Sequence, residues 1–185
     1  MTTRNTTNNL IKLNDVRLSY PALFRPKVWA DSSNEPKYEA TFILNKVTHG
    51  KEIQAIDARI NELLAEHKIS RSKIKADHLC LRDGDLTDKE EYQGAFTLKS
   101  STGRKFPIVN RDAKTRVVEE DNLLYGGCYV SAYIDLRYYN NKSIGIAANL
   151  KSLQYRGPGE AFGGNEHDIT DAYEPVEYEP EEDLF

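Results

Sequence analysis

The sequence predicts a mostly β protein: a five-stranded antiparallel barrel with one main α-helix and a disordered acidic C-terminal tail. Two observations lead to the barrel. Several segments alternate apolar and polar residues with a period of two, and they outnumber the one segment with clear helical periodicity. A third observation concerns the tail, because residues 160–185 contain ten Asp and Glu and no Lys or Arg. A closed barrel lets few strands bury a core without leaving long exposed edges.

The clearest strands are predicted over residues 37–44 and 128–139. Each has one apolar face, and these faces are expected to form the core: Tyr38, Ala40, Phe42 and Leu44 in the first, and Cys128, Val130, Ala132, Ile134 and Leu136 in the second. The pair Asn140-Asn141 predicts a turn, because Asn tolerates positive φ, and a return strand follows over residues 142–155. Weaker strand candidates are residues 11–20, 94–101 and 104–109.

A helix is predicted over residues 51–68. Its apolar side chains recur at helical spacing: Ile53, Ile56, Ile60, Leu63 and Leu64. A single apolar stripe of this kind is typical of a helix that packs across a sheet. Glycines at positions 157, 159, 163 and 164 indicate the end of the folded body. We therefore divide the chain into a disordered N-terminus over 1–9, a barrel domain over 10–157 and a flexible acidic tail over 158–185.

The formal net charge of −4 conceals two oppositely charged parts. Residues 1–159 contain 25 Lys and Arg against 19 Asp and Glu, so this part carries +6, whereas residues 160–185 carry −10. Such asymmetry indicates a polyanionic ligand, and an acidic segment that can imitate it. The two apolar residues that end the chain, Leu184 and Phe185, are typical of a peptide that docks in a partner's pocket.

The composition excludes several classes of protein. The polar start of the chain has no apolar stretch of the kind found in signal peptides, and no run approaches the ~20 apolar residues that span a bilayer. Two cysteines, Cys80 and Cys128, fit a reducing cytosol without a disulfide framework. We expect a soluble cytoplasmic protein with no membrane partner.

Among small barrels, the five-stranded OB-fold often carries a helix between strands and binds oligonucleotides across one face. This assignment is an analogy at the level of the fold. Sequence-tolerant binding of single strands needs aromatic planes for the bases and cations for the phosphates. The eleven Tyr and the basic body supply both, while no helix-turn-helix or zinc finger offers duplex readout.

The candidate DNA-binding residues are cations that cluster in connections, together with aromatic side chains beside them. They are Arg25, Lys27, Trp29, Lys99, Arg104, Lys105, Arg111, Tyr129, Tyr133, Arg137, Tyr139 and Lys142. Trp29 is equally compatible with a plug at the end of the barrel, since large aromatic residues usually bury most of their surface. Tyr129, Tyr133, Arg137 and Tyr139 share the polar face of one predicted strand.

Catalytic patterns are scarce, and we predict no enzyme, metal or cofactor. The pair His78 and Cys80 is too small a ligand set for zinc. Asp83 and Asp85, with Glu90 or Glu91, could hold Mg²⁺ in a nuclease, although Asp-Gly is also a common turn signal. Two alternatives therefore stay open: a metal-dependent nuclease, and a protein-interaction adaptor whose acidic tail mimics DNA.

Five short segments share their order and spacing with a known family: VRLSYPALF (16–24), PKYEATF (36–42), LRDGD (81–85), YGGCYV (125–130) and GIAANL (145–150). On these segments the chain resembles phage single-stranded-DNA-binding proteins with an OB-fold, over nearly the whole body. The resemblance implies non-catalytic protection of ssDNA during phage replication and recombination, in the cytoplasm of the infected bacterial host.

The tail separately resembles the acidic, aromatic-ended C-termini of replication single-strand binders in bacteria and T7-like phages. The resemblance implies that Asp183, Leu184 and Phe185 recruit replication proteins such as a polymerase or a helicase. Opposite charge further predicts that the tail competes with DNA for the basic body. A homodimer is left open as a further partner.

Overall fold

The computed structural model describes residues 9–28, 30 and 35–162. In this part of the chain the strands are β1 (Ile11–Lys27), β2 (Lys37–Asn45), β3 (Leu81–Asp83), β4 (Ala95–Thr102), β5 (Ile108–Val109), β6 (Tyr129–Asn140) and β7 (Ile144–Gly157). The helix is α1 (Gly50–Glu66), and short 3₁₀ turns occur at 71–73, 76–78, 84–86, 90–92 and 119–121. No helix of the described residues is both long and apolar enough to cross a membrane.

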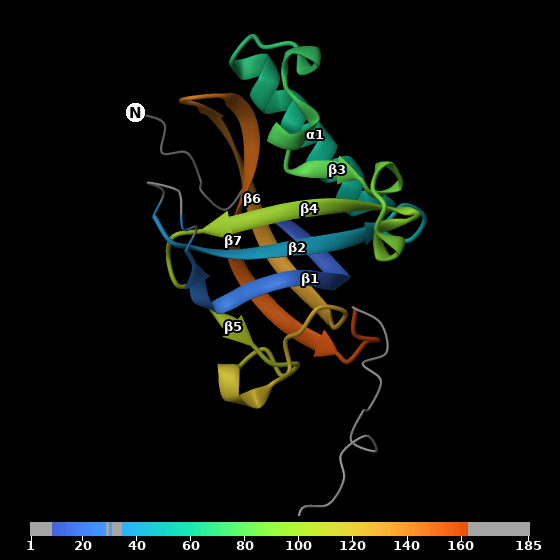
Figure 1. Ribbon diagram of the computed structural model, residues 1–185, viewed down its shortest axis with the longest axis vertical. Coiled ribbons are helices and arrows are strands. Elements are labelled where there is room, and N and C mark those ends of the chain that lie inside the picture. Colours follow the sequence, from blue (N-terminus) through green and yellow to red (C-terminus); the bar gives the residue numbers. More distant parts are fainter. Residues whose placement is uncertain (1–8, 29, 31–34, 163–185) are drawn as a thin grey trace, which may run out of the picture.

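Five of the strands close into a barrel (Figure 1). β1 lies between β2 and β6, β2 continues to β4, and β6 continues to β7. The barrel closes where β4 and β7 pair in parallel through Ser100 with Ala148 and Ser101 with Asn149. β3 and β5 extend the edges of β4 and β7. The predicted five-stranded barrel with one main helix is confirmed, with the correction that its closing pair is parallel and the barrel therefore mixed.

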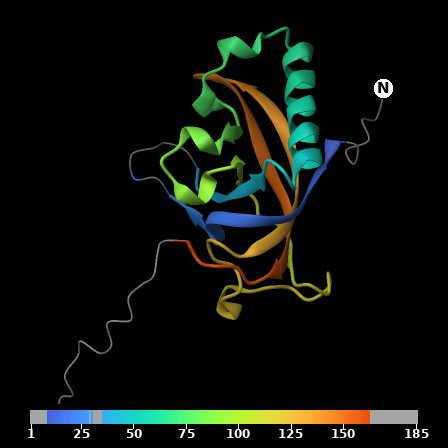
Figure 2. The same ribbon diagram turned by 90° about the vertical axis from the view of Figure 1, so that its right-hand side faces the viewer.

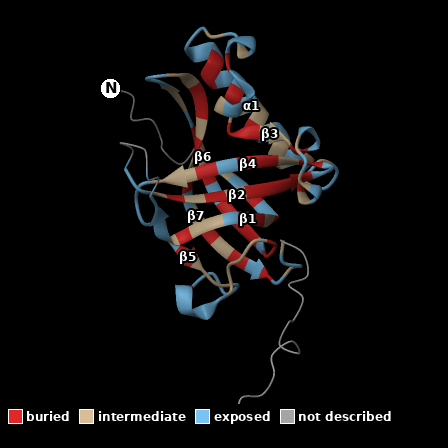
Figure 3. Ribbon diagram, viewed as in Figure 1, coloured by how far each residue is buried: buried red, intermediate tan, exposed pale blue. Residues whose placement is uncertain are grey.

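The core follows the predicted alternation. In β2 and β6 the side chains predicted to face inward are all buried, and Phe42, Leu44, Val130 and Ile134 are fully inaccessible to solvent. Figure 3 shows the buried residues concentrated in the barrel strands and the exposed ones in the connections at its ends. Period-two patterning predicted this core because each barrel strand has one face inside and one outside.

The helix covers one end of the barrel. Its buried residues are Ile56, Ile60, Leu63 and Leu64, as the helical spacing predicts. Figure 2 shows α1 running beside the upper part of the β6–β7 hairpin. There the His67 ring stacks on Tyr138, with ring centroids 3.8 Å apart. The helix ends at this point because Lys68 takes a left-handed φ of 53°.

Two predicted strands differ in extent from the structure. β1 continues to Lys27 because the strand takes up irregularities in its register instead of ending at Tyr20, and φ is positive at Asp15 and Tyr20. The candidate strand over 104–109 is wrong for most of its length, since only Ile108 and Val109 pair with β7. Residues 103–107 form a connection instead.

Residues 158–162, which we call the C-terminal strap, lie against the barrel after β7. The Tyr125 hydroxyl donates to the Gly159 carbonyl (2.8 Å), and the Phe162 N–H donates to the Gly126 carbonyl (3.0 Å). Gly127 permits this close approach, since a Cβ there would lie 2.1 Å from the Glu160 carbonyl oxygen. The rest of the predicted tail, 163–185, lies outside the described residues, as does the predicted disordered N-terminus up to residue 8.

Candidate nucleic-acid interface

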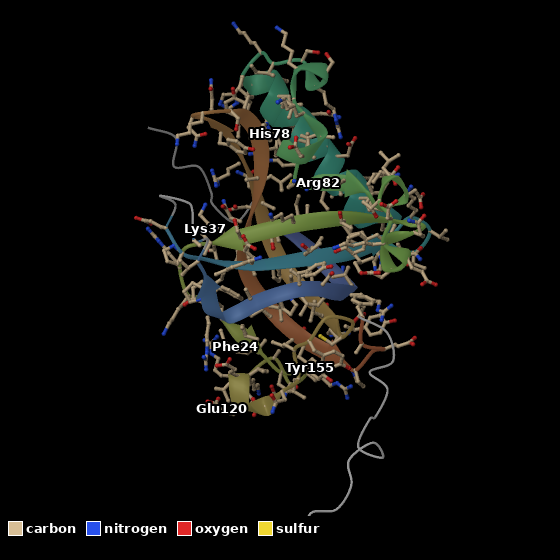
Figure 4. All side chains as sticks on the ribbon, in the orientation of Figure 1. Phe24, Lys37, His78, Arg82, Glu120 and Tyr155 are labelled. Carbon is tan, nitrogen blue, oxygen red and sulfur yellow. The ribbon has the colours of Figure 1, made fainter. Side chains whose placement is uncertain are left out.

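A basic groove of about 450 Å³ lies where β4 and β7 close the barrel. Its long side chains come from four separate parts of the chain: the start of β2, β3 with the turn before it, β4, and the β6–β7 hairpin. Figure 4 labels Lys37, His78 and Arg82 along this side of the molecule. Topology alone brings these residues together, since more than a hundred positions separate Lys37 from the hairpin residue Asn141.

Small side chains at the barrel closure make the groove hollow. Ser100, Ser101, Ala147 and Ala148 line its floor. The Ser100 hydroxyl is buried and donates to the Ala40 carbonyl (2.8 Å), so it does not fill the groove. A larger side chain at these positions would occupy the space that a ligand needs.

Four cations surround this floor: Lys37, Arg82, Lys99 and Arg137. Lys37 and Lys99 form no ion pair with any residue the structure describes. Arg82 is held in place by carbonyl oxygens, with Nε donating to Leu79 (3.1 Å). Among the residues that the structure describes, Asp77 supplies the one carboxylate that lines the groove. The groove therefore has a strong excess of positive charge, a field that attracts phosphate groups.

Tyr139 supplies the groove with an aromatic ring, and Gly145 makes room for it. The two residues are cross-strand partners in the β6–β7 hairpin. A Cβ at position 145 would lie 2.3 Å from the Tyr139 hydroxyl oxygen and 2.4 Å from the His78 carbonyl oxygen. Only glycine lets the ring lie directly across the β7 backbone. The Arg137 guanidinium lies 5.9 Å from the centre of this ring, which places a cation beside a stacking plane.

The family described as Enterobacter phage Enc34, ssDNA-binding protein, matches residues 9–185. The chain belongs to this family. Membership agrees with the resemblance seen in the sequence and with the prediction of a binding protein rather than an enzyme.

Three similar proteins illustrate how far this similarity extends over the chain. The single-stranded DNA-binding protein of bacteriophage Enc34, solved in complex with ssDNA, is 31% identical, with 84% of this chain and 90% of that chain covered and a TM-score of 0.75. Protein p50 of Acyrthosiphon pisum secondary endosymbiont phage 1 is 30% identical over 183 residues, covering 95% of this chain and 98% of its own. The T7 single-stranded DNA-binding protein gp2.5 shares the fold at 14% identity and a TM-score of 0.54, with 92% of this chain and 98% of that chain covered.

In this Enc34-type chain, three of the twelve candidate DNA-binding residues line the basic groove: Lys99, Arg137 and Tyr139. Lys142 is exposed and follows Asn141, which also lines it. Lys37, Arg82 and His78 were missed by sequence reasoning. Lys37 opens a predicted strand, and nothing in its sequence neighbourhood indicates a binding role. Arg82 stands next to Asp83-Gly84, which predicts only a turn.

Five of the predicted cations lie elsewhere on the surface. Lys105 borders an apolar hollow at the other end of the barrel, with Arg104 exposed beside it. Arg25 forms an ion pair with Glu119 (3.2 Å), and Lys27 lies 3.8 Å from Glu39. Arg111 donates to the Arg156 carbonyl oxygen. Trp29 and the tail tip, Asp183, Leu184 and Phe185, lie outside the described residues.

The polar face of β6 divides between two sides of the barrel. Tyr129 and Tyr133 lie in the half of β6 that also pairs with β1, where they face Arg17 and Lys12. Arg137 and Tyr139 lie beside β7 and reach the groove. The strand curves around the barrel and its register with β7 shifts between Tyr133 and Ile134, so residues that alternate correctly do not share one surface.

The two aspartates considered for a nuclease, Asp83 and Asp85, form ion pairs with Lys46 instead. Lys46 Nζ lies 2.7 Å from Asp83 Oδ1 and 2.6 Å from Asp85 Oδ2. The Asp83 carboxylate also accepts from the Asp85 N–H, and Asp85 accepts from the Gly94 N–H. Among the described residues, no group of three His, Cys, Asp or Glu could hold a metal ion.

These contacts lower the pKa of both carboxyl groups below the ordinary 3.8, chiefly through the hydrogen bond from Lys46. The resulting stabilisation is present above that pH and is lost as the pH falls through the lowered pKa values. Lys46→Met should therefore reduce the free energy of unfolding at pH 7, and the deficit should shrink below pH 3.8. Urea unfolding from pH 7 to pH 3 tests this, and a deficit that stays constant with pH would contradict it.

Gly145→Ala should force the Tyr139 ring off β7 and destabilise the protein by about 1–3 kcal/mol, the usual cost of overpacking. Adding Tyr139→Ala should recover part of this loss, because it removes one of the two clashes. Gly103→Ala is the matched control, since its Cβ would meet nothing within 4 Å. Thermal unfolding of the single and double variants measures these changes. If the two losses of stability simply add in the double variant, the position of the Tyr139 ring does not depend on Gly145.

Proposed function

We propose that this protein binds single-stranded DNA in the basic groove, with little sequence preference, as a non-catalytic protein of phage DNA replication and recombination. The observation that carries the proposal is the convergence of Lys37, Arg82, Lys99, Arg137 and Tyr139 on one hollow in a chain of a ssDNA-binding family. The Enc34 relative has been solved in complex with ssDNA, which supports the same ligand here.

Each group in the groove has a distinct role in this proposal. Lys37 and Lys99 neutralise phosphates, which releases the counterions condensed on the strand. The Tyr139 ring stacks on an unpaired base, and Arg137 beside it strengthens the contact. Because every base presents the same kind of aromatic face, stacking tolerates any sequence. Duplex DNA keeps its bases stacked on one another, so the protein should prefer single strands.

Lys99→Ala should weaken binding at low salt and reduce the slope of log K against log salt by about 0.7, the value for one phosphate contact on a single strand. Tyr139→Ala should cost about 1–3 kcal/mol without changing that slope. Fluorescence titrations at two salt concentrations measure both quantities. Lys51→Ala, on the exposed start of α1, is the control cation. Equal or tighter binding to blunt duplex, or unchanged slopes, would overturn the proposal.

We further propose that the acidic tail competes with DNA for the body and recruits replication proteins through Asp183, Leu184 and Phe185. Ten carboxylates on residues 160–185 and a body of +6 supply the attraction. When DNA occupies the groove, the tail is released and its apolar tip becomes available to a partner. The infected host cytoplasm is the compartment in which such partners meet the protein.

Ending the chain after Phe162, which keeps the strap, should tighten ssDNA binding, most strongly at low salt where the Debye length is longest. Removing only Leu184 and Phe185 should leave DNA affinity nearly unchanged while abolishing capture of replication proteins. Affinity that is identical with and without residues 163–185 at every salt concentration would exclude competition. A full-length protein that binds no ssDNA even at low salt would instead favour the DNA-mimicking adaptor.

A further inference from the structure

A second set of aromatic rings and cations lies on the opposite side of the barrel from the basic groove. Three tyrosines are exposed in the described part of the chain: Tyr20 (62%), Tyr129 (39%) and Tyr133 (40%). None of them lines the groove. Each has a cation over its ring, namely Lys89 at 3.9 Å, Arg17 at 5.7 Å and Lys12 at 5.9 Å from the ring centre.

Four of these residues, from β6, β1 and the connection before the 3₁₀ turn at 90–92, form a strip that we call the β1 strip: Tyr129, Arg17, Lys89 and Tyr20. Phe162 and Tyr92 join its two halves. The Arg17 guanidinium lies 4.3 Å from the Phe162 ring, and Lys89 Nζ lies 5.2 Å from the Tyr92 ring. Phe162 packs against the small apolar cluster of Ile43, Tyr92 and Ala95. Each half of the strip thus has a cation between two rings: Arg17 between Tyr129 and Phe162, and Lys89 between Tyr92 and Tyr20.

The backbone of β1 turns Tyr20 outward. Val16 and Leu18 are fully buried, so strict alternation would direct the side chain at position 20 into the barrel. Instead Tyr20 takes a φ of 46°, the register with β2 shifts after Ser19, and the next inward residue is Leu23. A left-handed conformation is unfavourable for an aromatic residue, and such conformations concentrate at binding sites.

The strip offers two cations to a polyanion, Arg17 and Lys89, and Lys89 is flanked along the chain by Asp88, Glu90 and Glu91. Arg17 and Lys89 have aromatic rings beside them, and no carboxylate pairs with either within the described residues. Arg17 is oriented by the backbone carbonyl oxygens of Gly127 and Glu160. Asp15, the acid nearest on β1, is paired with Arg156 at 2.7 Å. Its charge is therefore largely neutralised.

The strip and the groove lie on opposite sides of the closed barrel. β1 is separated from β4 by β2, and from β7 by β6. A strand that leaves the groove would therefore have to pass around the barrel to reach Tyr129 and Tyr20. Stacking planes with adjacent cations are what a sequence-tolerant path for ssDNA requires.

We propose that the β1 strip is a second contact surface for single-stranded DNA, which continues the path of a strand bound in the basic groove. This inference rests on the proposed function for its ligand. Oligonucleotides that fill only the groove do not reach the strip, whereas longer ones contact both surfaces.

The test compares oligothymidylates of about 8 nucleotides, which lies within the usual range of roughly 4–16 for one OB-fold, and of about 30, which lies beyond it. The double variant Tyr20→Ala with Lys89→Gln should bind the long strand about tenfold more weakly, and its site size in nucleotides per protein should fall. Its affinity for the short strand should stay within about twofold of the wild-type value. Tyr139→Ala, the groove variant, should weaken binding of both lengths.

Photo-crosslinking of the full-length wild-type protein to a long strand carrying 5-iododeoxyuridine gives a second readout that needs no variant. Crosslinks at Tyr20 or Tyr129 in addition to Tyr139 are expected. Crosslinks confined to the groove, together with an unchanged site size in the double variant, would overturn the second surface while leaving the proposed function intact. If the wild type binds neither length, the proposed function itself fails. Thermal unfolding of each variant confirms that the fold is retained.

Discussion

The parallel pairing of β4 with β7 is the constraint on which the rest of the structure depends. It closes the sheet, so that the inner faces of five strands meet in one core and no long edge stays open. It also requires two strands to approach through Ser100 and Ala148, side chains small enough for the strands to meet over a shallow floor. The same closure that completes the core therefore creates the basic groove beside it.

The sequence predicted the parts of the fold that follow from local alternation. Phe42, Val130 and Ile134 are buried where a period of two places them, and Ile56 and Ile60 where a helical period does. The parallel closure could not be read in this way, because it joins segments that are nearly fifty residues apart. Irregularities in a strand were equally hidden, since nothing in the residues around Tyr20 indicates that the strand continues past it.

The candidate site was predicted less completely than the core. Lys99, Arg137 and Tyr139 were found because cations and rings cluster around predicted strands, but the prediction could not separate them from Arg25 or Arg111, which bind other parts of the chain. Charge clustering along a sequence identifies exposed cations, whereas only topology decides which of them converge. Lys37 and Arg82 complete the groove for that reason. The Asp83 and Asp85 pair shows the converse, since a sequence pattern that suggested metal chemistry is explained by Lys46.

The C-terminal strap connects the β1 strip with the acidic tail. Arg17 holds the strap through the Glu160 carbonyl oxygen and the Phe162 ring, and the same guanidinium faces Tyr129 in the β1 strip. The tail therefore starts at the strip, on the far side of the barrel from the groove. Twenty-three residues follow Phe162. Fully extended they reach about 75 Å, which exceeds the distance around half of a body with a radius of gyration of about 15 Å. A tail that competes for the groove must thus pass around the barrel, and on the side taken by the proposed DNA path the two would share one surface. Competition along the whole path would displace the tail progressively as the bound strand lengthens, so that long strands release its tip more completely than short ones.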